Sequence, residues 1–158
     1  EIVKSLLTEY YIVRFGWMIG GKSKDKKFVS YILQQIKDGN KEFNIVNDTF
    51  GTPTYTKDVA KNLEVLFNTA HYGTYHMTCK GEATRVEIAK HILDTLKVKN
   101  YKINEVSSEF FREQFPITRA SSERLVNNNL ELLGINLMRN WKDALTDYLT
   151  EEVKTNGQ

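Results

Sequence analysis

The chain has 158 residues, about the length of one ordinary domain that can bury a hydrophobic core. Its hydrophobic fraction of 41% and charged fraction of 27% are typical of a globular protein and exclude a disordered or fibrous one. The net charge is +2 with positive and negative residues interspersed, which does not indicate a nucleic-acid partner. The single cysteine excludes a disulfide framework, and no apolar run reaches the roughly 20 residues of a membrane helix.

Helix and strand patterns alternate along the first half of the chain. Residues 2–7 have the pattern of a helix tail, and residues 10–21 (YYIVRFGWMIGG) predict a buried strand that runs into a loop. A charged, exposed loop is expected at residues 22–27, followed by a helix over residues 28–36 and a short strand at residues 43–48. The next helix places Val59, Leu63, Leu66 and Phe67 on one face, and Thr56 is its predicted N-cap.

The second half continues the alternation. Its expected elements are a strand at residues 73–79, a helix over residues 83–98 with Thr84 as N-cap, a strand at residues 101–107, a short helix that ends at Gly134, and a last helix over residues 140–149. The tail at residues 151–158 should fray. This order predicts an α/β fold with at least some parallel strand pairing, in one compact unit.

Several catalytic signatures are missing from the sequence. No strand leads through a Gly-x-Gly-x-x-Gly loop into a helix, no tyrosine is followed four residues later by lysine, and no phosphate-binding loop of the Walker type occurs. His71, His76 and His91 are scattered, without carboxylates at metal-ligand spacing, and Cys79 cannot build a zinc site alone. We therefore expect no catalytic residue and no metal site within these 158 residues.

One loop carries more hydroxyl groups than a helix cap needs. The stretch NDTFGTPTYTKDVA places Thr52, Thr54, Tyr55 and Thr56 around a Gly-x-Pro just before a helix. It resembles a segment of dTDP-4-dehydrorhamnose reductases, which are members of the extended short-chain dehydrogenase/reductase superfamily. Four further stretches resemble that family in order and spacing: YYIVRFGWMIGG, GTYHMTCKGEATRVEIAKHI, FPITRASSERLVNNNLELLGI and NWKDALTDYL.

The resemblance covers almost the whole chain and implies that it is the C-terminal portion of such a reductase. The fold would comprise the last strands of a dinucleotide-binding sheet together with the small substrate-binding lobe. The family's N-terminal half, with the cofactor loop and the Tyr-x-x-x-Lys pair, would be the missing partner, and Glu1 matches the glutamate that closes that segment. NADPH or NADH would bind the parent protein, and neither is expected to bind this chain tightly alone.

The resemblance also implies roles for particular residues. Trp17 would line the sugar pocket, where an indole face packs on the apolar side of a deoxyhexose. Arg119 would meet the diphosphate oxygens of the nucleotide, and Gly16, which replaces the family's usual serine, would let the backbone approach the nicotinamide. Thr54 and Tyr55 would wall the substrate site, although both also suit an ordinary turn.

Other residues have structural interpretations. Asp58 in a first helical turn suits the helix dipole, and we expect Glu123 and Asn127 to hold their loop in place. His76 is interpreted as a core histidine, and Cys79 as inert. Arg14 is more simply a solvated arginine than a ligand contact.

The parent enzyme would reduce the C4 ketone of a dTDP-linked 6-deoxy-4-keto sugar in a cytoplasmic setting. Two alternatives remain open: a related reductase or epimerase with another nucleotide-sugar, and a non-catalytic regulatory or binding module built on the same lobe. A Tyr-x-x-x-Lys pair upstream of Glu1 would favour a reductase. The sequence does not determine the exact sugar, the choice between NADH and NADPH, or the oligomeric state.

Overall fold

The computed structural model describes residues 1–21, 27–114 and 120–153, except for the side chains of residues 152 and 153. Its helices are α1 (Ile2–Leu6), α2 (Phe28–Lys37), α3 (Thr56–Phe67), α4 (Arg85–Thr95), α5 (Asn128–Leu132) and α6 (Trp141–Asp147), with a 3-10 helix at Ser108–Phe111 and a π-helical turn at Tyr148–Val153. Its strands are β1 (Tyr11–Arg14), β2 (Met18–Ile19), β3 (Glu42–Val46), β4 (Phe50–Gly51), β5 (Thr54–Tyr55), β6 (Gly73–His76), β7 (Ala83–Thr84), β8 (Lys102–Val106) and β9 (Ser122–Glu123).

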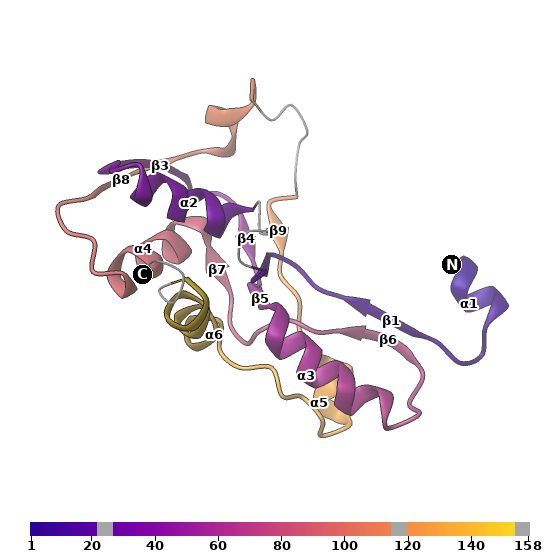
Figure 1. Ribbon diagram of the computed structural model, residues 1–158. Helices are drawn as coiled ribbons and strands as arrows, with labels where there is room; N and C mark the ends of the chain where they lie inside the picture. Colours follow the sequence, from indigo (N-terminus) through magenta and orange to yellow (C-terminus); the bar gives the residue numbers. More distant parts are fainter. Residues whose placement is uncertain (22–26, 115–119, 154–158) are drawn as a thin grey trace.

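Two regions lie next to one another in the molecule (Figure 1). The β1–β6 region contains α1, β1, β6, α3 and α5, and the β3–β8 region contains β3, β8, α2 and α4. Helix α6 and the short strands lie between them. The pairs β1–β6, β2–β5 and β3–β8 are all parallel, which confirms the expected α/β fold with parallel pairing.

The strand expected over residues 10–21 is divided in two, which corrects the prediction of one buried strand. Strand β1 ends at Arg14 and β2 begins at Met18, where the chain pairs with β5 instead of β6. The break coincides with Trp17, whose φ of +27° is incompatible with extended backbone. No residue of β1 is fully buried, so this strand is only partly covered within the described chain.

The β3–β8 region contributes many buried side chains to the apolar core of the described chain. Strand β3 alternates strictly, with Phe43 and Ile45 buried and their neighbours exposed or half-buried. Helices α2 and α4 pack against each other, and α4 also packs on β3. Ile32 of α2 and Ile92 of α4 are fully buried, so the helical periodicities of both segments face this core.

Of the two predicted N-cap residues, Thr84 is confirmed and Thr56 is wrong. Thr84 caps α4 as expected: its hydroxyl accepts from the Glu87 amide, and the Glu87 carboxylate accepts from the Thr84 amide. The prediction for Thr56 is wrong, because α3 begins at Thr56 itself, with Tyr55 at the N-cap and no side-chain cap bond. On the predicted apolar face of α3, Val59 and Leu66 are buried, whereas the Phe67 side chain is 56% exposed.

A buried ion pair connects α3 to the chain before α6. Asp58, 3% exposed, accepts two hydrogen bonds from the Arg139 guanidinium, at 3.1 Å from Nε and 3.0 Å from Nη2. Arg139 also pairs with Asp147 of α6. Hydrogen bonds to Asp58 and then Asp147 raise the pKa of Arg139 above its usual value. The structural role predicted for Asp58 is confirmed, through this bidentate pair more than through the helix dipole.

Candidate substrate-binding site

Trp17 occupies a strained backbone position in the loop between β1 and β2. Its φ of +27° is unusual for a bulky residue, and such strain persists only where the surroundings determine the conformation. The Trp17 carbonyl accepts from the Thr54 amide at 3.1 Å, and the indole Nε1–H donates to Glu123 Oε2 at 2.5 Å. Trp17 remains half-buried, so part of its side chain is accessible.

The indole of Trp17 packs closely on Gly51 of β4. A Cβ atom at Gly51 would lie 2.2 Å from Cε2 and 2.4 Å from Cδ2 of the ring, so no other residue fits there without moving Trp17. The guanidinium of Arg85 lies over the Trp17 ring at 4.8 Å and over the Phe28 ring at 4.9 Å. The sequence did not identify Arg85, Phe28 or Gly51 as neighbours of Trp17, because no local pattern links these residues to it.

Thr54 and Tyr55 lie in the core of the molecule. Their exposed fractions are 0% and 1%, and Thr52 is buried as well. The Thr54 hydroxyl donates to the Thr52 carbonyl at 3.3 Å, and the Tyr55 ring packs against Tyr148 with centroids 6.0 Å apart. The surplus hydroxyls of this loop therefore serve internal contacts, and the predicted substrate contact of Thr54 and Tyr55 stays a prediction.

Three more residues were considered for ligand contacts from the sequence: Gly16, Arg119 and Arg14. Gly16 is half-buried, and a Cβ there would meet Glu123 O at 3.5 Å and Thr52 O at 3.6 Å, which are ordinary contacts. Its predicted approach to a nicotinamide stays a prediction. Arg119 lies outside the described residues, so its predicted contact with the diphosphate stays a prediction. Arg14 is exposed at the end of β1.

The loop-fixing roles predicted for Glu123 and Asn127 are confirmed. Glu123 holds Trp17 through its indole. The Asn127 side chain accepts from the Thr78 amide at 2.9 Å and donates to the Thr78 carbonyl at 2.7 Å, so it replaces a backbone partner for that segment. The prediction of a core histidine is wrong for His76, which is only half-buried, with Nδ1 3.3 Å from the Val126 carbonyl.

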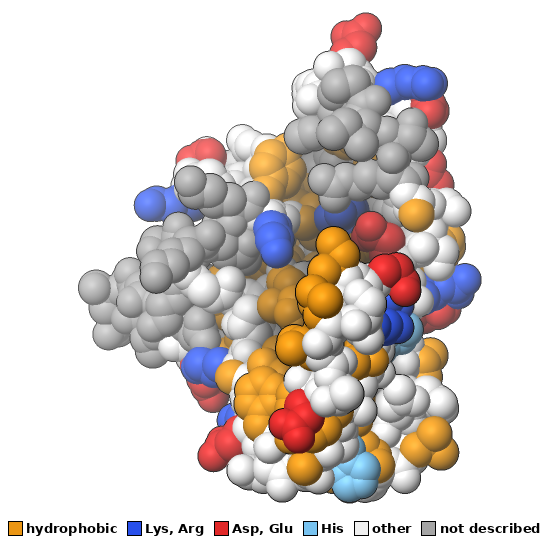
Figure 2. Space-filling view, turned by 90° about the vertical axis from the view of Figure 1, so that its right-hand side faces the viewer, with side chains coloured by type: hydrophobic (Ala, Val, Ile, Leu, Met, Phe, Trp, Pro, Cys, Tyr) orange, Lys and Arg blue, Asp and Glu red, His pale blue; other side chains and the backbone are white. Residues whose placement is uncertain are grey.

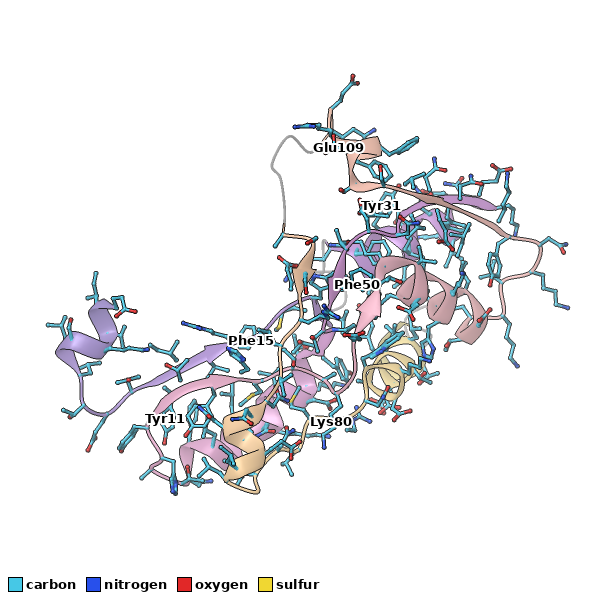
Figure 3. All side chains as sticks on the ribbon, turned by 180° about the vertical axis from the view of Figure 1, so that it is seen from behind. Tyr11, Phe15, Tyr31, Phe50, Lys80 and Glu109 are labelled. Atoms are coloured by element: carbon cyan, nitrogen blue, oxygen red, sulfur yellow. The ribbon has the colours of Figure 1, made fainter. Side chains whose placement is uncertain are left out.

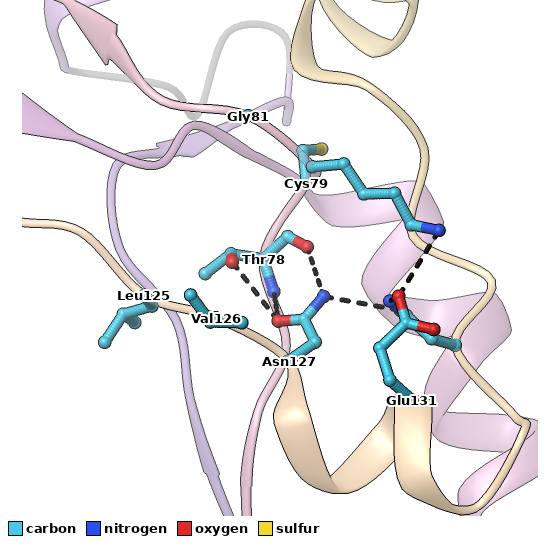
Figure 4. A pocket seen from close by; sticks show the side chains of 9 residues that line it. Thr78, Cys79, Gly81, Leu125, Val126, Asn127 and Glu131 are labelled. Carbon is cyan, nitrogen blue, oxygen red and sulfur yellow. Dashed lines mark hydrogen bonds and ion pairs between the residues drawn. The ribbon is translucent and has the colours of Figure 1, made fainter.

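A hollow of about 190 Å³ lies between residues 78–81 and the segment 125–136 (Figure 4). Glu131 pairs with Lys80 at 3.4 Å, and hydrogen bonds from Asn136 and then Lys80 lower the pKa of its carboxyl. Burial raises the pKa of the Cys79 thiol to about 11, so the thiol is protonated at neutral pH and unreactive, as expected. The hollow thus contains no activated nucleophile.

Two kinds of feature are absent from the described residues. These residues contain no group of three or more histidine, cysteine, aspartate or glutamate side chains that could hold a metal ion. Among the helices of residues 1–21, 27–114 and 120–153, none is both long and apolar enough to cross a membrane.

Several known proteins are similar to this chain in sequence. Spore coat polysaccharide biosynthesis protein SpsK of Bacillus subtilis is 29% identical over 151 residues, which cover 96% of this chain and 50% of that protein. A dTDP-4-dehydrorhamnose reductase of Mycobacterium tuberculosis is 28% identical over 151 residues, which cover 94% of this chain and 48% of that protein. The chain therefore spans about half the length of the curated relatives it matches.

Solved structures agree with the sequence relatives. The crystal structure of dTDP-4-dehydrorhamnose reductase from Bacillus anthracis in complex with NADP superimposes with a TM-score of 0.83 and 29% identity, over 95% of this chain and 51% of that one. The expected fold, that of part of an extended reductase, is thereby confirmed. The family described as RmlD substrate binding domain matches residues 1–154. Because this match spans almost the whole sequence, the chain belongs to the RmlD substrate binding domain family.

Proposed function

We propose that this chain is the substrate-binding half of an NAD(P)-dependent reductase that acts on the C4 ketone of a dTDP-linked 6-deoxy-4-keto sugar. The observation that carries the proposal is the match of residues 1–154 to a substrate-binding domain. The named relatives include dTDP-4-dehydrorhamnose reductases, and one solved relative holds NADP. Fold alone would not support an activity, so the proposal also depends on a suitable site.

Trp17 is the residue of the proposed site with the clearest geometry. Its side chain is accessible and anchored at once, whereas Thr54 and Tyr55 are enclosed. An indole supplies a flat apolar surface for the carbon face of a deoxyhexose, and its fixed orientation lowers the entropic cost of binding. In the proposal, Arg119 neutralises the diphosphate and Gly16 leaves room for the nicotinamide. Binding energy from such groups can orient the reacting carbon.

The proposal requires a second half that holds the cofactor and the proton donor. NADPH or NADH would supply the hydride there, and the residues of this chain would bind and orient the sugar. The exposed apolar side chains of the β1–β6 region supply a suitable contact surface for such a half (Figure 2). They include Ile2, Leu6, Leu7, Phe15 and Tyr72. A reducing, cytoplasmic setting is part of the proposal, because Cys79 is a free thiol and NAD(P)H is the reductant.

The test is a reductase assay on the full-length protein that contains this chain. A dTDP-linked 6-deoxy-4-keto sugar is added with NADPH or NADH, and oxidation of the cofactor is followed by absorbance. We expect sugar-dependent oxidation by the full-length protein and none by the 158-residue chain alone. If the full-length protein binds the nucleotide-sugar tightly but does not oxidise the cofactor, the result would favour the regulatory module. Absence of both oxidation and binding would overturn the proposal.

A further inference from the structure

Three residues that surround the Trp17 indole lie in one small sheet or directly after one of its strands. Strands β7, β4 and β9 form this sheet in that order, and they lie side by side in the middle of the molecule (Figure 1). Gly51 lies in β4, Glu123 lies in β9, and Arg85 directly follows β7. Three restraints on one indole thus depend on the pairing of segments that are far apart in the sequence.

The register of this sheet sets two of the restraints together. Gly51 and Glu123 are direct partners in the parallel pair β4–β9, so the glycine under the indole and the carboxylate on its N–H are fixed relative to each other. The indole N–H donates to a charged carboxylate, a stronger class of hydrogen bond than one between neutral groups, at an exposed residue of β9. The acceptor selects the direction of the indole N–H, and the close packing on Gly51 restrains the face of the ring.

Glu123 also opposes the strain at Trp17. The backbone there has a φ of +27°, which costs free energy unless surrounding contacts compensate. The Thr54 amide holds the Trp17 carbonyl, and Arg85 covers the ring, but neither contact restrains the N–H edge of the indole. The N–H edge of the indole donates to Glu123.

We propose that Glu123 is a positioning residue of the substrate site, which sets the orientation of the Trp17 indole and thereby the affinity for the sugar portion of the nucleotide-sugar. This inference rests on the proposed function. Glu123 itself touches no reacting atom in this scheme and acts through Trp17. Glutamine retains an acceptor oxygen at the same distance from the backbone, whereas alanine removes it.

The experiment compares Glu123→Ala with Glu123→Gln in the full-length protein that contains this chain. The first measurement is the indole N–H resonance of Trp17, identified by its loss in Trp17→Phe. We expect Glu123→Ala to shift this resonance and Glu123→Gln to shift it less. The resonance of Trp141, whose indole donates to the Glu82 carbonyl, serves as an internal reference that should not move.

The second measurement is the Michaelis constant for the dTDP-linked 6-deoxy-4-keto sugar. We expect Glu123→Ala to raise it about three- to ten-fold with little change in kcat, since a binding orientation is lost and no reacting group is removed. Glu123→Gln should lie within about two-fold of the wild type on the same reasoning. Glu109→Ala is the control for loss of a surface carboxylate, because Glu109 pairs with Arg112 at the far tip of the molecule (Figure 3).

The outcomes separate this inference from the proposed function. If the wild type turns over the sugar and Glu123→Ala leaves the Michaelis constant unchanged, the positioning role is wrong and the proposed function stands. A Trp17 resonance that does not move in Glu123→Ala also overturns the positioning role. If the wild type neither binds nor reduces the sugar, the proposed function fails and the inference fails with it.

Discussion

The β1–β6 and β3–β8 regions contain the same motif, a pair of parallel strands, but differ in how completely they cover it. Strand β3 contributes fully buried side chains that α2 and α4 enclose, whereas no residue of β1 is fully buried and α1 buries none. Parallel strands are normally covered on both faces, and a lone pair of strands is marginal. Strand β3 is therefore better covered within the described chain than β1, and the β1–β6 region exposes apolar surface suited to a further partner.

The side-chain view illustrates the same contrast. Tyr11 lies in β1 and Phe15 directly follows this strand, and both are well away from Tyr31 on α2 (Figure 3). Around Tyr11, the rings of Phe67 and Tyr72 form an exposed aromatic cluster with centroids 5.1 and 5.3 Å from it. A patch of this kind on a globular protein typically marks a contact surface. We expect the two regions to differ in local stability for this reason.

The sharpest test of the comparison is a matched pair of phenylalanine substitutions. Phe43→Ala in the β3–β8 region should lower the free energy of unfolding by about 3–5 kcal/mol, because it leaves a cavity in a closed core. Phe67→Ala in the β1–β6 region removes a ring that is 56% exposed and should cost less than about 1.5 kcal/mol. Urea denaturation of both variants measures the difference, and equal losses would contradict the comparison.

The second test concerns the ion pair that ties α3 to α6. Asp58→Ala should lower the free energy of unfolding by about 1–3 kcal/mol, because the Arg139 guanidinium loses its bidentate acceptor. The loss is smaller than for a wholly buried pair, since the Arg139 side chain is 38% exposed and Asp147 still pairs with it. Asp58→Asn, which keeps an acceptor oxygen, is the control. A loss as small as that of an exposed pair, such as Arg112 with Glu109, would show that this ion pair does not stabilise the contact between α3 and α6.

The third test addresses the loop where the β1–β6 region leads into the short strands. Trp17→Ala in the full-length protein should raise the Michaelis constant for the sugar by roughly ten-fold, about 1.4 kcal/mol. Trp17→Phe, which retains an aromatic face, should raise it less. An unchanged constant in Trp17→Ala would remove this residue from the site.

The smallest expected effect is a pH dependence confined to the β3–β8 region. Burial lowers the pKa of His91, whose Nε2 lies 2.8 Å from the Thr146 hydroxyl. The unfolded chain then binds the proton more readily, so the free energy of unfolding should fall as the pH drops below about 6.5. His91→Gln should reduce this fall, as measured by urea midpoints between about pH 7 and about pH 5. The same substitution at the exposed His71 is the control, and an equal effect there would contradict the assignment.

The sequence by itself determined the longer elements. Helices α2, α3 and α4 follow from apolar spacing, and the Thr84–Glu87 capping box is readable from its residues. The alternation of strands and helices was enough for the fold class. These features are local, because a helix or a cap is built from residues within a few positions of each other.

The tertiary structure alone decided the short strands and the surroundings of Trp17. Strands β4, β5, β7 and β9 have two residues each, too few for any period to show. Glu123 lies 106 positions from the tryptophan that it holds, and Arg85 reaches the ring only because β7 pairs with β4. Burial of Thr54 and Tyr55 depends likewise on packing against distant α6 and the turn after it. Such contacts form only when remote segments pack together, so no local pattern announces them.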